Sequence, residues 1–302
     1  MPPHGGPSNE SEHERGKARS GQPLPPLVSA ALDPAASSLE ARLARLKAAD
    51  SARYTHLGEV AQGGMGRILR VWDERLGREV AMKIVARELS SEASEDERHE
   101  HERRLARFVD EARITAQLDH PSIVPVYEIG LEPGGAVFFT MPLVRGEHLG
   151  RIFEHAWAGR DGWSLARVVD VLHKVSLTLA FAHARGVVHR DLKPENVMVG
   201  PFGEIYVMDW GLALLVGKQE REGIVGTPAY MSPEQASGKI GAVGPRSDVY
   251  ALGALLYEYF ARRRPHESSL DASLTTGESF DSVLARPPRP LRALAPDVPR
   301  EL

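Results

Sequence analysis

Residues 187–200 read "VVHRDLKPENVMVG", and they follow directly on a long apolar pattern typical of a buried helix. A loop at that point would place its polar side chains in a cleft. Asp191 can accept or orient a hydroxyl proton, Lys193 can neutralise a phosphoryl group, and the oxygen of Asn196 can bind Mg²⁺. A polar surface loop without chemistry is the alternative, so the rest of the chain has to decide between the two.

The segments before this loop divide the chain into a strand-rich part and a helical part. Residues 54–83 alternate short β-branched or aromatic runs with glycine turns, which predicts a small antiparallel sheet. A charge-dense helix follows over 87–118, solvated at first and apolar on one face from 108 onward. Strands are predicted at 125–130 and 136–144, and a long helix between a Ser164 cap and Gly186.

The overall composition excludes several classes of protein. The chain has 302 residues, 42% of them hydrophobic and 26% charged, which suits one large domain or two lobes. A formal charge of -4 argues against nucleic acid and anionic membranes as partners. The chain lacks cysteine, which excludes disulfides and thiol chemistry and suits a reducing cytosol. Neither a signal peptide nor a membrane segment is predicted, so a cytoplasmic protein is expected.

The N-terminal region, residues 1–53, is predicted to be an arm outside the main domain. Residues 1–37 are rich in proline, glycine and serine and are expected to be disordered. Within 38–50, leucines at 39, 43 and 46 form a helical stripe. This short amphipathic helix is expected either to pack on the domain or to bind a partner.

The loop at 187–200 resembles the catalytic loop of bacterial eukaryotic-like (Hanks-type) serine/threonine protein kinases, matching His-Arg-Asp-Leu-Lys-Pro-x-Asn completely. The resemblance implies an α+β, two-lobed fold. Its N-lobe, residues 54–141, is a small antiparallel sheet with one main helix; a hinge follows at 142–144 and a mainly helical C-lobe over 145–302. The C-lobe is expected to lack its last helices. Lys193 points to Ser/Thr rather than Tyr specificity.

The N-lobe motifs that the resemblance organises imply an ATP site. "AQGGMGRI" at 61–68 is similar to the glycine-rich loop, with alanine in place of the first glycine, and "VAMK" at 80–83 to the third-strand motif. Lys83 is expected to hold the α- and β-phosphates, with Glu111 as its ion-pair partner; Asp110 and Glu102 are the rivals. The implied ATP-binding residues are Ala61, Gly63, Gly64, Gly66, Ile68, Ala81, Lys83, Met141, Pro142, Val144 and Met198.

Within that set, the resemblance gives several residues a specific place. Met141 is the expected gatekeeper, the carbonyl of Pro142 and the N–H of Val144 hold adenine at the hinge, and Ile68 and Met198 enclose the ring. "MDWG" at 208–211 is similar to the family's Asp-Phe-Gly motif, with Trp210 for phenylalanine. Mg²⁺ is accordingly expected at Asp209 and Asn196.

The stretch 209–234 corresponds to the family's activation segment. Thr227 is its first hydroxyl residue and is expected to contact Asp191 and Lys193, so that its phosphorylation blocks as readily as it activates. We hypothesise that Glu220 or Glu222 gives Arg190 a fixed negative charge.

Two structural expectations come from the same region of the resemblance. Asp248 is expected to anchor the backbone of the catalytic loop. Glu234 is expected to be a buried carboxylate that needs an arginine, with Arg262 to Arg264 as candidates.

The expected activity is transfer of the ATP γ-phosphoryl group to Ser/Thr of protein substrates in signalling. Asp191, Lys193, Lys83 and Glu111 are the candidate catalytic residues. One rival is a pseudokinase or inactive fragment that acts as a binding scaffold, although every catalytic position is filled. A small-molecule phosphotransferase is the second rival, and a dimer is left open.

Overall fold

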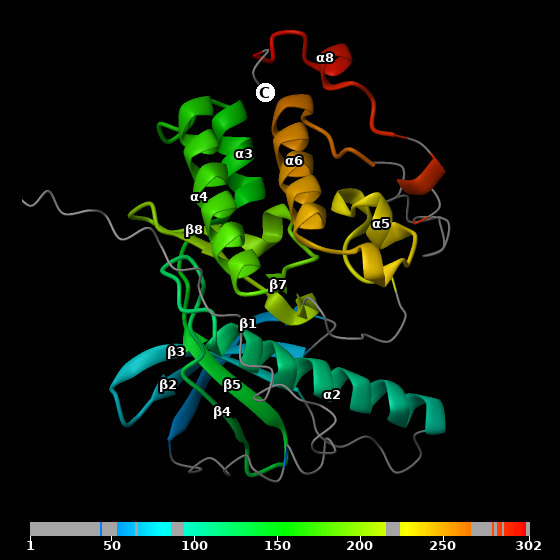
Figure 1. Cartoon of the computed structure of the whole chain (residues 1–302). Helices are drawn as coiled ribbons and strands as arrows, with labels where there is room; N and C mark the ends of the chain where they lie inside the picture. Colours follow the sequence, from blue (N-terminus) through cyan, green and yellow to red (C-terminus); the bar gives the residue numbers. More distant parts are fainter. Residues whose placement is uncertain are drawn as a thin grey trace, which may run out of the picture.

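The computed structural model describes Leu43 and residues 53–63, 66–85, 94–215, 224–266, 280, 283–285 and 287–299. Figure 1 shows two lobes, a small sheet-containing lobe and a larger helical one. The chain is therefore α+β with the predicted two-lobed arrangement. The predicted disorder of 1–37, and Gly64, Glu220 and Glu222, lie outside the described residues.

The small lobe is built on a five-stranded antiparallel sheet in the order β1-β2-β3-β5-β4. The register places Ile68 opposite Lys83 and Ala81 opposite Met141, so the candidate nucleotide residues share three adjacent strands. The predicted strand at 125–130 begins later, at Glu128. The strands are β1 (Tyr54–Gly63), β2 (Gly66–Asp73), β3 (Arg78–Val85), β4 (Glu128–Leu131) and β5 (Val137–Pro142).

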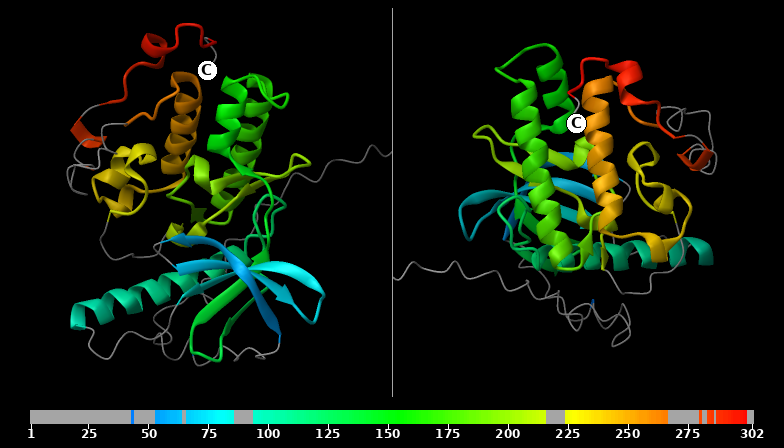
Figure 2. Two further views of the ribbon diagram at one scale, coloured as in Figure 1. Left: turned by 180° about the vertical axis from the view of Figure 1, so that it is seen from behind. Right: turned by 45° about the horizontal axis from the view of Figure 1, so that its top comes forward.

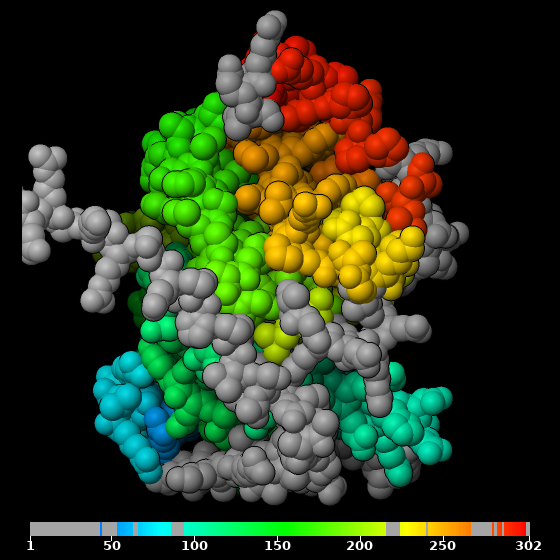
Figure 3. Space-filling model, in the orientation of Figure 1, coloured from blue at the N-terminus to red at the C-terminus, as the bar shows by residue number. Residues whose placement is uncertain are grey.

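One long helix, α2 (Glu95–Ala116), packs on this sheet, as predicted for the charge-dense region. It begins at Ser94, whose side chain and that of Glu97 form a reciprocal capping box. Residues 95–100 are exposed, whereas Phe108 and Val109 are fully buried, which is the predicted change of character along the helix. Figure 3 shows α2 at the edge of the small lobe, where part of it projects to the side.

The large lobe is centred on three helices, of which α4 and α6 lie side by side in both views of Figure 2. The helix α4 starts at its predicted cap, where Ser164 accepts from the Arg167 N–H. The helices are α3 (Leu149–Trp157), α4 (Leu165–Ala184), α5 (Pro233–Ala236), α6 (Pro245–Ala261) and α8 (Leu291–Leu294). The short strands are β6 (Glu147–His148), β7 (Val187–Val188), β8 (Val197–Val199), β9 (Ile205–Val207) and β10 (Leu214–Leu215).

The strands β6, β8 and β9 form one small sheet, and β7 pairs with β10. Strands β7 and β8 flank the segment 189–196, so the candidate catalytic loop leaves one buried strand and returns into another. Val187, Val197 and Val207 are fully buried in the core that also holds α4 and α6. The loop therefore has rigid supports at both ends.

The expectation for Glu234 is wrong in one respect, because its carboxylate is half-buried rather than buried. It accepts a 2.6 Å hydrogen bond from the Ser247 hydroxyl at the start of α6. Arg264, a candidate partner, lies instead with Tyr230 and Glu258: its Nε is 3.0 Å from the tyrosine hydroxyl and 3.7 Å from the carboxylate. A half-exposed carboxylate keeps part of its hydration, so the high cost of an unpaired buried charge does not arise.

None of the helices among the described residues is both long and apolar enough to span a bilayer.

Candidate active site

A cavity of about 690 Å³ lies between the two lobes, within the size range of small-molecule sites. Its lining comes from β1, β2, β3, α2, β5 and the segments 124–126, 143–144 and 191–212. The sequence-predicted residues that it brings together are Ala61, Gly66, Ile68, Ala81, Lys83, Glu111, Met141, Pro142, Val144, Asp191, Asn196, Met198 and Asp209. Gly63 ends β1, where it is paired with Gly66, and Gly64 is outside the described residues.

Gly66 has a steric reason to be glycine. A side chain there would place its Cβ 2.3 Å from the carbonyl oxygen of Ile84, and the backbone φ of +132° is unfavourable for other residues. The backbone of β2 at Gly66, its first residue, can therefore lie directly against β3, which carries Lys83. This close approach fixes the roof of the cavity.

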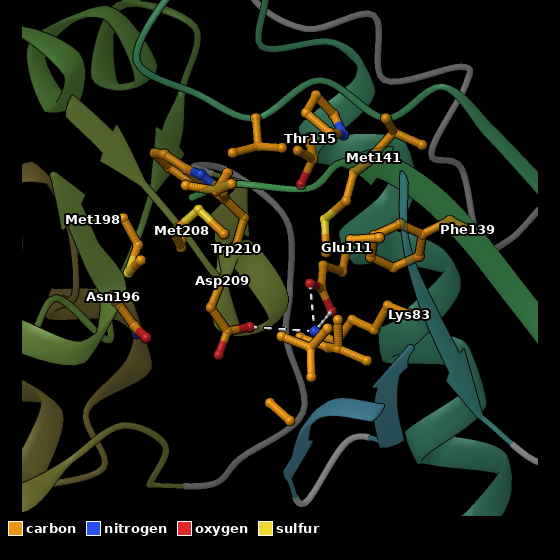
Figure 4. Close-up of a pocket in the computed structure, with 18 of the residues that line it drawn as sticks. Lys83, Glu111, Thr115, Phe139, Met141, Asn196, Met198, Met208, Asp209 and Trp210 are labelled. Carbon is orange, nitrogen blue, oxygen red and sulfur yellow. Dashed lines mark hydrogen bonds and ion pairs between the residues drawn. The ribbon is translucent and has the colours of Figure 1, made fainter. Parts of the chain in front are cut away.

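Lys83 and Glu111 form a buried ion pair on the N-lobe side of the cavity. The Lys83 Nζ lies 2.7 Å and 2.8 Å from the two carboxylate oxygens, and the two side chains are 10% and 5% exposed. Figure 4 shows these side chains facing Asp209, whose Oδ1 is 3.4 Å from the same Nζ. Glu111, rather than Asp110 or Glu102, is thus the residue that the fold brings to Lys83.

The charges at this point favour the ionised forms of Lys83 and Asp209, whereas burial raises the pKa of the Glu111 carboxyl. Burial alone lowers the pKa of Lys83, but the carboxylates of Glu111 and Asp209 outweigh it and raise the pKa above the ordinary lysine value. Desolvation opposes ionisation of Asp209, although its side chain is 45% exposed, and the charges of Lys83, His189 and Lys193 keep the pKa of this carboxyl below its usual range. A fixed ammonium group therefore stands beside a fixed carboxylate in the cavity.

The backbone around Asp209 aims its carboxylate at Lys83. Asp209 adopts a left-handed conformation with φ of 60° and ψ of 71°, which is costly for a residue other than glycine. The next residue, Trp210, is 2% exposed, and its Nε1 donates to the Val207 carbonyl at 3.1 Å. The indole also packs edge-on against the His189 ring. This buried anchor holds the strained turn in place.

Asp191, Lys193 and Thr227 form a closed hydrogen-bond triangle on the opposite side. The Lys193 Nζ donates to Asp191 Oδ2 at 2.7 Å and to the Thr227 hydroxyl at 3.0 Å. The Thr227 hydroxyl donates to Asp191 Oδ1 at 2.7 Å. The predicted contact of Thr227 with these two residues is confirmed, and it ties the activation segment to the catalytic loop.

Asp248 anchors the backbone of the candidate catalytic loop, as predicted. Its side chain is completely buried and accepts from the backbone N–H groups of His189 and Arg190 at 2.8 Å and 2.9 Å. The ring of His183 contacts the same carboxylate at 2.7 Å. Arg190 has a positive φ of 68°, so Asp248 holds a strained residue directly before Asp191.

Comparison with known proteins agrees with this geometry. The family description "Protein kinase domain" matches residues 54–286, most of the chain. The chain belongs to the protein kinase family. The match thus covers the small lobe, the large lobe as far as residue 286, and every residue of the cavity described above.

Several bacterial serine/threonine-protein kinases are similar to this kinase domain. PknA of Mycobacterium tuberculosis is 36% identical over 259 residues, covering 83% of this chain and 56% of that protein. The DNA damage-responsive kinase RqkA of Deinococcus radiodurans is 38% identical over 250 residues, with 81% and 35% covered. PknD of Protochlamydia amoebophila is 31% identical over 281 residues, with 82% and 27% covered. The chain therefore spans between about a quarter and just over half of these relatives.

Sequence reasoning missed several residues that line the cavity, among them Thr115, Phe139, Leu143 and Met208. Each lies close in the sequence to a residue that was predicted. Thr115 lies one helical turn after Glu111 and so shares its face of α2. Leu143 lies between the two predicted hinge residues, and Met208 directly precedes Asp209. The periodicity of helix and strand would have identified Thr115 and Phe139, whereas Leu143 and Met208 could have been found only as chain neighbours of predicted residues.

The kinase family implies Mg²⁺, and the side chains present fit it. Asp209 supplies carboxylate oxygens at the cavity. Asn196 donates from its Nδ2 to the backbone carbonyl and Oδ2 of Asp191, at 2.7 Å and 3.2 Å, which turns its amide oxygen the other way. Carboxylate and amide oxygens are the donors that Mg²⁺ takes, together with phosphate oxygens. Both residues come from the C-lobe side of the cavity in Figure 4.

The triangle around Thr227 makes a prediction about this position. Thr227→Ser keeps a hydroxyl between Asp191 and Lys193, so we expect kcat/KM for the protein acceptor to stay within about threefold of wild type. Thr227→Glu places a second carboxylate next to Asp191, and we expect a loss of at least about tenfold from like-charge repulsion. Initial rates of phosphate transfer measure both. A Thr227→Glu variant with wild-type rates would show that the triangle has no role.

Proposed function

We propose that this kinase domain transfers the γ-phosphoryl group of ATP to serine or threonine hydroxyls of protein substrates, in signalling. One observation supports the proposal above others. The cavity is lined both by the buried Lys83–Glu111 ion pair and by Asp191, the carboxylate of the Asp191–Lys193–Thr227 triangle. The first can hold phosphates and the second can receive a hydroxyl, as phosphoryl transfer requires.

The shape and chemistry of the cavity support ATP binding. Its apolar sides, which include Ile68 and Met198, suit a flat adenine ring, and the hinge at Pro142 to Val144 offers backbone groups to the ring edge. Lys83, held in one position by Glu111, places its positive charge where the α- and β-phosphates would lie. Glu111 acts by keeping the Lys83 side chain from leaving the cavity.

The acceptor hydroxyl would bind next to the hydrogen-bond triangle of Asp191, Lys193 and Thr227. Asp191 orients the hydroxyl and takes its proton, because its carboxylate lines the cavity and already accepts a hydrogen bond from a hydroxyl, that of Thr227. Lys193 stabilises the negative charge that is transferred, since its ammonium already lies within hydrogen-bond distance of Asp191 and Thr227. Asn196 supports Asp191 by donating to its carbonyl and its carboxylate.

Asp209 and Asn196 would hold Mg²⁺, which when bound neutralises the charge of the phosphates. ATP and Mg²⁺ are therefore the proposed cofactors.

ATP is a nucleotide of the cytoplasm, and we propose that the kinase domain is located there. A dimer stays a prediction.

The proposal is tested by measuring binding and transfer on the same preparation. We expect ATP with Mg²⁺ to raise the Tm of the protein and labelled γ-phosphate to appear on a protein acceptor. A rise in Tm without transfer would contradict the kinase activity and support the binding scaffold. Transfer to a small alcohol but to no protein would instead indicate a small-molecule phosphotransferase.

A further inference from the structure

Leu43 is a core residue of the small lobe although it lies eleven positions before the first strand. Its side chain is 4% exposed and its backbone is helical. The matched kinase domain begins at residue 54, so this leucine comes from outside it. It is the central member of the leucine stripe at 39, 43 and 46, the helical pattern expected either to pack on the domain or to bind a partner.

The cluster that Leu43 joins lies between α2 and the sheet. From α2 it contains Leu105, Phe108, Val109 and Ala112, and from β5 it contains Val137 and Phe139. The α2 residues have the spacing of one helix face. Phe108 and Phe139 are in ring contact at 5.0 Å between centroids, so the two elements meet inside this cluster. Leu43 is therefore part of the layer that sets the distance of α2 from the sheet.

The same layer is adjacent to the nucleotide cavity. Phe139 belongs to the cluster and also lines the cavity, 5.9 Å from the Lys83 Nζ, and Met141 packs against the cluster and lines the cavity too. Glu111 directly precedes Ala112, a cluster residue, and carries the carboxylate that holds Lys83. A shift of α2 that filled a void at Leu43 would thus change the Lys83–Glu111 distance.

We propose that Leu43 is a positioning residue, through which the segment before the kinase domain holds α2 with Glu111 against Lys83. The inference rests on the proposed function where it concerns catalysis, but its structural part is independent of it. Removing the side chain leaves a cavity that surrounding atoms fill only in part. Helix α2 then opens more often, and the nucleotide site is complete for a smaller fraction of the time.

The test compares full-length variants at two buried leucines of the same lobe. Leu43→Ala is the cavity variant, Leu43→Val a milder one should the first not fold, and Leu43→Met keeps the volume nearly unchanged. The matched control is Leu69→Ala. Leu69 is 7% exposed in a separate cluster on β2, and its side chain points away from that of Ile68 because strand residues alternate.

We expect Leu43→Ala to speed hydrogen exchange of the amides of residues 105–112 by about tenfold or more, and to lower kcat/KM for ATP about tenfold. Leu69→Ala should lower Tm to a similar extent and leave both quantities within about threefold. Leu43→Met should restore wild-type values. Equal exchange in α2 for Leu43→Ala and wild type, or equal effects of the two alanine variants, would overturn the proposal.

The exchange measurement separates this inference from the proposed function. If the chain bound ATP but transferred no phosphate, the proposed function would fail, whereas the exchange of α2 would still decide the role of Leu43. If transfer occurred and exchange in α2 did not respond to Leu43→Ala, only the present inference would be lost.

Discussion

Asp191→Asn is expected to reduce kcat for phosphate transfer by about 10²- to 10⁴-fold, the usual contribution of a positioned acid or base. The change is nearly isosteric. An asparagine oxygen can still accept from Lys193, and its amide group can donate to the Thr227 hydroxyl, so both contacts of 2.7 Å keep a partner. What disappears is the negative charge that, in the proposed mechanism, orients the acceptor hydroxyl and takes its proton. Nucleotide affinity should therefore stay within about threefold.

The matched control is Asp170→Asn, because Asp170 is an exposed carboxylate on α4 that pairs with Lys174 at the surface. This variant should keep wild-type rates and Tm, since such surface pairs contribute little. Initial rates at saturating ATP, with the Kd of ATP measured separately by calorimetry, distinguish the two effects. An Asp191→Asn enzyme that keeps wild-type rates would overturn the assignment of Asp191.

Asp248→Ala is expected to lower the free energy of unfolding by about 3 to 5 kcal/mol, the range for breaking a buried charged network. The backbone N–H groups of His189 and Arg190, and the His183 ring, would lose their shared acceptor inside the protein. For a domain of this size the loss corresponds to a fall in Tm of about 10 °C. Activity should fall as well, because the strained turn at Arg190 loses the bonds that hold it.

Two further variants make the Asp248 test specific. Asp248→Asn keeps one oxygen for the loop and should fall between alanine and wild type. Asp297→Ala removes an exposed carboxylate near the end of the described chain and should change Tm by less than about 2 °C. Thermal unfolding followed by circular dichroism measures all three. A Tm of Asp248→Ala equal to that of wild type would contradict the anchoring role.

The sequence predicted elements well where a local pattern specified them. The Ser164 cap and the apolar spacing after it placed α4 within a residue or two, and glycine turns separated the first three strands. The contact between Lys83 and Glu111 is different. Twenty-eight positions separate the two residues, across a charged segment of unusual length, so no local rule pairs them. Only the resemblance to the kinase family supplied that contact.

The environment of Glu234 could be predicted neither from local sequence patterns nor from the resemblance to the kinase family. Its burial and its bond from Ser247 depend on how the end of the activation segment meets the first turn of α6. Arg264 contacts the Tyr230 and Glu258 side chains instead of Glu234. These three residues meet only when separate elements of the fold pack together. Burial of Leu43, in contrast, was indicated by the leucine stripe, although the surface that receives it was not.

The most direct test of the central claim is phosphoamino-acid analysis of the product after incubation with γ-labelled ATP, Mg²⁺ and a protein acceptor. The account predicts label on serine and threonine, absent from the Asp191→Asn reaction. Label confined to tyrosine, or an acceptor that stays unlabelled while ATP raises the Tm, would contradict it.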